Sequence, residues 1–135
     1  MRVVDEYTVA IPNYDGNGMY LSMGNLVQTG EVGLLFIDFE NQYRMRFNGK
    51  ATMSSDDPLM AEYPEAQFIV RIRAREIFGN CPRYIHKMKL VQHSRFVPRT
   101  ECQTPIPTWK AKYVEQGLLP KDDLAHDKSR EALDK

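Results

Sequence analysis

The chain has 135 residues, a length at which one domain can bury a single hydrophobic core. Its 18 basic and 18 acidic residues give a formal net charge of zero, so its overall charge does not favour nucleic acid or an anionic membrane as partner. No apolar run approaches the ~20 residues of a membrane span, and the N-terminus carries no secretory signal pattern.

The first elements are a strand, a loop and a short helix. Residues 3–11 predict a strand that Pro12 ends, and residues 13–18 form a polar loop with two glycines. Apolar side chains at helical spacing predict a helix over residues 19–28, and Gly30 is a natural stop for it. We expect this helix to plug one end of a β structure.

The next segment predicts a β-hairpin. The apolar run 32–39 and the alternating segment 43–53 are separated by a short polar turn, which is typical of two antiparallel strands. The second strand carries Arg44 and Arg46 on one face. Guanidinium groups on a rigid strand can hold phosphate or carboxylate, although a solvated face is the simpler interpretation.

The longest predicted strand covers residues 66–78, after a short helix that an aspartate and Pro58 begin. A helix or turn is expected after Pro82, and residues 90–98 could return as a strand. Several strands with short helices predict a mainly β fold, an antiparallel barrel or half-barrel.

The C-terminal part differs in composition. We expect a split-barrel domain over residues 1–100 and a proline-stiffened connector with a charged helix or tail over 101–135. Residues 109–116 predict a helix that Gly117 ends. Residues 121–135 are highly charged and predict a solvated helix or a frayed tail.

Three segments resemble the pyridoxamine 5'-phosphate oxidase-like proteins, which fold as FMN-binding split barrels. They are TVAIPNYDGNGMYLSMGNLVQTGEV with the hairpin that follows, the strand AQFIVRIRAREIF, and the motif GNCPRYIHKM. The resemblance covers most of the chain. It implies an antiparallel split barrel, FMN as cofactor, an oxidoreductase acting on an unknown small substrate, and a homodimer whose flavin sites use both subunits.

The resemblance also implies a set of cofactor-binding residues. The loop and helix start would face the FMN phosphate, and Arg44 stands where the oxidases place a cofactor-contacting glutamine. Arg83, His86 and Lys87 could clamp an anion at the dimer groove, or they could form a basic turn on the surface. No catalytic residue is indicated. The expected cofactor-binding residues are Asn13, Asn17, Tyr20, Ser22, Arg44, Arg83 and Lys87.

Two departures from the family support an alternative function. The oxidases carry a Ser-Arg-Lys set near the position of Tyr20 and Ser22, and this chain lacks both cations. The family's first strand pair also has no counterpart in this sequence, so we expect an N-terminally shortened barrel with exposed strand edges. Either a partner chain covers this gap, or the sequence is a shortened form of a longer protein. The alternative is a cofactor-free homodimeric interaction or structural relative. A third option is a haem or deazaflavin binder on the same barrel.

The cysteines and histidines predict neither a metal site nor a disulfide framework. Cys81 and Cys102 have no second pair nearby, and the three histidines show no ligand spacing. A reduced, cytoplasmic protein is the expectation. Cationic neighbours could lower the pKa of Cys81, but a buried, inert thiol is the preferred interpretation.

Overall fold

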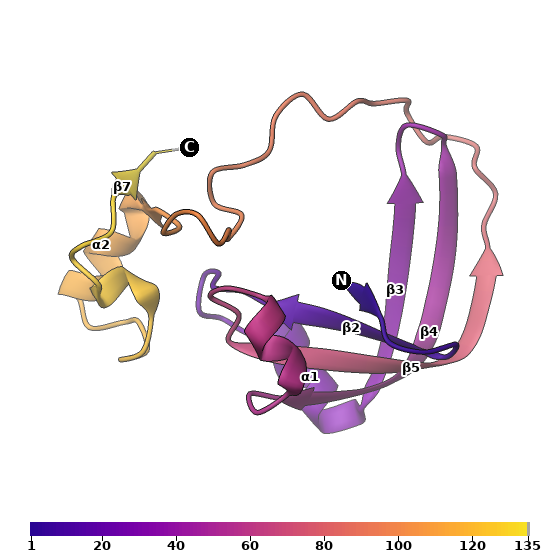
Figure 1. The fold of residues 1–135 in the computed structure, drawn as a ribbon, viewed down its shortest axis with the longest axis horizontal. Coiled ribbons are helices and arrows are strands. Elements are labelled where there is room, and N and C mark those ends of the chain that lie inside the picture. The colour runs from indigo at the N-terminus through magenta and orange to yellow at the C-terminus, as the bar shows by residue number, and fades with distance from the viewer. Residues whose placement is uncertain (135) are drawn as a thin grey trace.

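A five-stranded antiparallel sheet forms the main body of the computed structural model, which describes residues 1–134 (Figure 1). The strand order is β1-β2-β5-β4-β3. The strands are Arg2–Val3 (β1), Thr8–Asn13 (β2), Glu31–Asp38 (β3), Tyr43–Ser54 (β4) and Phe68–Gly79 (β5). This confirms the predicted mainly β, antiparallel architecture and is consistent with a split barrel.

The predicted hairpin is confirmed as β3 and β4. Its ladder runs from Glu31 opposite Lys50 to Asp38 opposite Tyr43. The Asp38 carboxylate closes the turn by accepting hydrogen bonds from the backbone N–H groups of the next two turn residues, Glu40 and Asn41. The local sequence therefore specifies both the strand pairing and the turn.

Two helical segments cover the two faces of the sheet at one end. Helix α1 (Leu21–Thr29) contributes Leu26 to the larger cluster of buried side chains, which also contains Val9, Phe47, Ala51, Val70 and Ile72. The 3-10 helix η1 (Pro58–Glu62) contributes Leu59 to a second cluster with Ala10 and Ile69. The end of the sheet that carries α1 is thus packed on both faces.

A β-bulge coils the central strand pair. The register of β4 and β5 shifts between Asn48 and Gly49, so that Arg75 is an extra residue on β5. A Cβ atom at Gly49 would lie 2.0 Å from the carbonyl oxygen of Arg73. Glycine is required here because the neighbouring backbone occupies the space of a side chain.

The opposite end of the sheet leaves apolar side chains uncovered. Arg46 on β4 lies between Leu35 on β3 and Phe78 on β5, directly opposite each of them. Ile37 on β3 lies opposite Arg44 on β4. Directly opposite residues share a face, so these three apolar side chains and the two arginines form one outer surface. Leu35, Ile37 and Phe78 are all exposed.

Two sequence-based strand predictions were wrong. The strand predicted over residues 3–11 is divided in two by a tight turn at residues 4–7, because the Asp5 carboxylate accepts a hydrogen bond from the N–H of Tyr7. Its second part, β2, does not end at Pro12 as predicted but continues to Asn13. Residues 90–98 form no strand, since β5 is already paired with β2 and β4 and the chain leaves the sheet at Asn80 (Figure 1). The turn after Pro82 is present.

The C-terminal residues form a small folded unit beside the sheet (Figure 1). The predicted helix is confirmed as α2 (Thr108–Glu115), but the solvated helix or frayed tail over 121–135 was wrong for the part that the structure describes. That part contains the 3-10 helix η2 (Leu124–His126) and a short strand β7 (Ala132–Leu133), which pairs in parallel with β6 (Ile106–Pro107). Lys135 lies outside the described residues.

No helix within residues 1–134 is long and apolar enough to cross a membrane.

Two glycines give a matched test of the bulge. We expect Gly49→Ala to lower the free energy of unfolding by at least about 2 kcal/mol, because the new methyl group meets backbone that must shift. Gly24→Ala in α1 should instead raise it by about 1 kcal/mol, since a Cβ there meets nothing within 4 Å. Urea denaturation measures both values. Similar effects of the two substitutions would contradict the assigned role of Gly49.

Candidate functional site

Four of the seven expected cofactor-binding residues line one cavity. The cavity has a volume of about 340 Å³ and lies at the start of α1. Its wall includes Asn13 at the end of β2, Asn17 in the following loop, and Tyr20 and Ser22 at the start of the helix. These four residues belong to one continuous segment, which the sequence analysis expected to face the phosphate.

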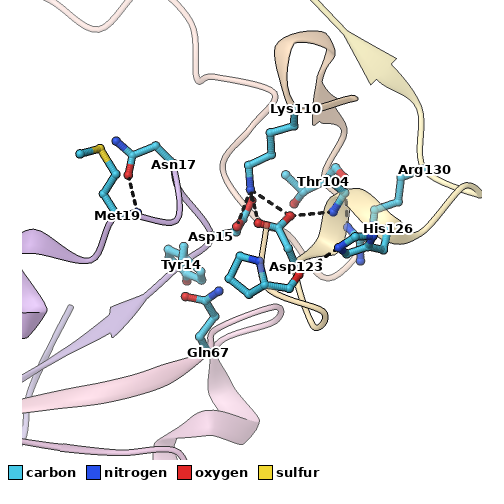
Figure 2. A network of polar contacts seen from close by, with 12 residues as sticks. Tyr14, Asp15, Asn17, Met19, Gln67, Thr104, Lys110, Asp123, His126 and Arg130 are labelled. Atoms are coloured by element: carbon cyan, nitrogen blue, oxygen red, sulfur yellow. Dashed lines mark hydrogen bonds and ion pairs between the residues drawn. The ribbon is translucent and has the colours of Figure 1, made fainter. Parts of the chain in front are cut away.

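Hydrogen bonds fix the shape of this cavity. The Gln67 side-chain oxygen accepts from Asn13 Nδ2 at 2.8 Å and from the Tyr20 hydroxyl at 3.0 Å. The Asn17 side-chain oxygen accepts from the backbone N–H of Met19 at 3.1 Å (Figure 2). Tyr20 itself has a φ of 48°, in the left-handed region, which turns the chain sharply into the helix.

The start of α1 has the properties of an anion site. Within the described residues, no side chain caps the first turn, and the turn contains no acidic residue. The first amides of a helix have no carbonyl partner inside it and carry the positive end of the helix dipole. An oxyanion such as a phosphate suits this position. None of the described residues that line the cavity, however, has a charged side chain to neutralise it.

The arginine group lies elsewhere. Arg44 is the second residue of β4, and its carbonyl oxygen accepts from the backbone N–H of Asn80 at 3.1 Å. Arg46 donates to the Asn80 side-chain oxygen at 3.2 Å, whereas Arg44 Nε is shielded from solvent and has no hydrogen-bond partner within residues 1–134. Lys87 is exposed on the extended segment that follows β5.

The Cys81 thiol belongs to this group and is exposed, so the expectation of a buried thiol was wrong. The chain leaves the sheet at this point, and no element covers the thiol. Its pKa is held below the ordinary value by the backbone N–H of Arg83, by the Arg83 side chain at 3.2 Å, and by the charge of Arg44. Arg83 is therefore oriented toward sulfur, next to Arg44.

The two groups lie at opposite ends of the sheet. Asn13 pairs with Phe68, and the next residue, Ile69, pairs with Ser54 at the end of β4. Arg44 stands ten residues earlier on the same strand, about 30 Å away along the path of the strand at the usual rise per residue. Within one chain, segment 13–22 and Arg44 are therefore too far apart to hold the same phosphate.

A buried ion cluster anchors the loop, and the sequence analysis missed it. Lys110 on α2 is 1% exposed, and its ammonium group contacts the carboxylates of Asp15 at 2.7 Å and Asp123 at 2.8 Å (Figure 2). Asp123 also begins η2 by accepting from the N–H of Ala125. The only sequence signal was a lysine between the aromatic residues Trp109 and Tyr113 of a short helix, which does not identify partners 95 and 13 residues away.

Within residues 1–134, no group of three or more His, Cys, Asp or Glu side chains is arranged to hold a metal ion.

Comparisons with known proteins give only distant structural likeness. No family model matches the chain, and no curated protein matches it. A crystal structure of HupZ from Group A Streptococcus is similar over 58% of this chain and 67% of its own, with 18% identity and a TM-score of 0.47. A histidine-to-alanine variant of HupZ gives 19% identity, a TM-score of 0.49 and coverages of 59% and 72%.

The Lys110 cluster gives a direct test of what holds the loop. Lys110→Met should lower the free energy of unfolding by about 3–5 kcal/mol, because two carboxylates would face each other in a buried site without a cation. Lys112→Met on the same helix, at an exposed position, should change it by less than about 0.5 kcal/mol. Urea denaturation followed by the fluorescence of Trp109 measures both. Equal stability of the two variants would remove Lys110 from this role.

Proposed function

We propose that the protein binds FMN as a member of the pyridoxamine 5'-phosphate oxidase-like group, and that two copies of the chain form each flavin site. The observation that carries the proposal is the cavity at the start of α1. Asn13, Asn17, Tyr20 and Ser22 were assigned to the flavin phosphate by resemblance alone, and they surround one space beside unpaired helix amides.

The phosphate of FMN would lie at the first turn of α1. The backbone amides there can donate to phosphate oxygens, and the side chains of Asn17 and Ser22 offer further polar groups. These groups position an anion without neutralising it. The missing positive charge must therefore come from residues outside this wall.

The second copy would supply that charge through Arg44 and Arg83. In the same chain these arginines lie at the other end of the sheet, since Arg44 is about 30 Å along β4 from its Ser54 end and Arg83 lies near Arg44. They lie next to the exposed apolar surface of Leu35, Ile37 and Phe78, which is suited to contact another protein surface. Arg44 Nε is buried and has no hydrogen-bond partner among residues 1–134, and an anion from the facing subunit would satisfy it.

Bound FMN would supply the redox chemistry of an oxidoreductase, taking electrons from or returning them to a small substrate. The chain's own residues would bind the phosphate, orient the ring and limit access of water.

A cofactor-free homodimer is the second candidate. None of the described residues that line the cavity at the start of α1 has a charged side chain, whereas the oxidases have cations at that place. This difference favours the cofactor-free homodimer. The same apolar surface would then serve only assembly.

Flavin affinity distinguishes the roles of the two strand arginines. Arg44→Ala should weaken FMN binding by about 1.5–3 kcal/mol, the scale of a hydrogen bond to a charged group. Arg46→Ala is the matched control, since Asn80 already satisfies its Nε, and it should change affinity by less than about 0.5 kcal/mol. Quenching of flavin fluorescence gives both constants. Equal FMN affinity of wild type and Arg44→Ala would remove Arg44 from the site.

Assembly is tested independently of the cofactor. We expect sedimentation equilibrium to show a dimer at micromolar concentration, because the exposed apolar side chains on the sheet need cover. Leu35→Lys with Phe78→Lys should shift the protein to a monomer by placing charges in the contact. A wild-type monomer at these concentrations would contradict a site built from two copies.

A further inference from the structure

A second cavity of about 380 Å³ adjoins the first. The two share Tyr14, Gly16 and Asn17 as wall residues, so the 14–17 loop separates them. The remaining wall comes from the turn before β5, from the end of the extended segment after β5, and from the C-terminal unit. Only the packing of the C-terminal unit against the loop creates this space.

The wall is aromatic and apolar over much of its surface. Tyr14, Phe96 and Trp109 reach it from three separate parts of the chain, and prolines and Ile106 lie between them. Burial raises the pKa of Tyr14, so its phenol stays neutral. Several aromatic rings in one cavity wall are suited to contact with a flat ligand.

Among the described residues that line this second cavity, every charged side chain is acidic. They are Asp15 and Glu65, and no described lysine, arginine or histidine lines the cavity, although Glu65 is paired with the largely buried Arg130 behind the wall. Asp15 shares the single charge of Lys110 with Asp123, so these three groups have a formal charge of −1. The cavity therefore favours a cation.

Glu65 provides a specific acceptor. One of its oxygens accepts from Arg130 at 2.5 Å, whereas the other, Oε2, is shielded from solvent and has no hydrogen-bond partner within residues 1–134. Burial acts to raise the pKa of Glu65, but the contacts from Thr104 and Arg130 outweigh it and leave the pKa below its ordinary value. The carboxylate is thus ionised at neutral pH, and its unused oxygen lies just behind the surface of the cavity wall.

We propose that this cavity binds a planar aromatic ligand that carries a protonated ring or amino nitrogen. The ligand's ring would stack among Tyr14, Phe96 and Trp109, and its N–H group would donate to Glu65 Oε2 after a small rotation of the carboxylate. The volume suits a small heteroaromatic molecule. This site is independent of the proposed flavin site, which favours an anion.

Trp109 provides the readout because it is the only tryptophan of the chain. The probe is proflavine, a planar acridine cation, and anilinonaphthalene sulfonate is the anionic comparison. Titration of the full-length protein with proflavine should quench Trp109 saturably at one molecule per chain. The anionic probe should bind at least tenfold more weakly, and excess FMN should not displace proflavine.

Three variants locate the binding. Glu65→Gln should weaken proflavine at least tenfold by removing the charge, and Phe96→Ala should weaken it several-fold by removing one ring. Glu115→Gln makes the same change of charge at an exposed position of α2 and should leave the affinity unaltered. Circular dichroism of each variant verifies folding, and Phe96→Ala decides the matter if Glu65→Gln fails to fold.

Three outcomes would overturn the proposal. They are quenching that does not saturate, equal affinity for the cationic and anionic probes, and unchanged proflavine affinity in Phe96→Ala. Displacement of proflavine by FMN would also overturn it, because the two ligands would then share one site.

Discussion

The buried ammonium of Lys110 is the contact on which the rest of the molecule depends. It joins α2 to Asp15 in the loop after β2 and to Asp123 before η2, so one charge fixes the sheet, the loop and the C-terminal unit in one arrangement. A buried lysine needs carboxylate partners with good geometry, and here it has two. Because the 14–17 loop forms a wall of both cavities, this contact positions each of them.

The two cavities have opposite electrostatic character although they share a wall. The cavity at the start of α1 offers backbone amides and neutral side chains to an anion, whereas the cavity beside Trp109 offers carboxylates and rings to a cation. Neutralising an anion at α1 requires Arg44 and Arg83, which lie at the other end of the sheet. Dimerisation is therefore a requirement of the proposed flavin site, and the exposed apolar residues beside Arg44 supply a surface for it.

The sequence predicted the elements whose information is local. The hairpin, helix α1, the long strand β5 and helix α2 follow from periodicity and turn residues. The β1–β2 turn at Asp5 was missed because a two-residue strand leaves almost no pattern. The Lys110 cluster and the folded C-terminal residues were missed for a different reason. Their ion pairs join residues far apart in the chain, and a charge-rich segment gives no sign that some of its charges are buried.

The candidate site shows the same limit. The family resemblance and the expected helix start identified the four residues around the start of α1. They did not show that Arg44 lies at the other end of the sheet, because that depends on the length and pairing of the strands.

The most direct measurement of the central claim is equilibrium dialysis of the purified protein against FMN and, separately, riboflavin, with bound flavin read from visible absorbance. The account predicts about one FMN per chain and much weaker retention of riboflavin, because the phosphate is the anchored group. Failure to retain either flavin, or equal retention of both, would contradict it.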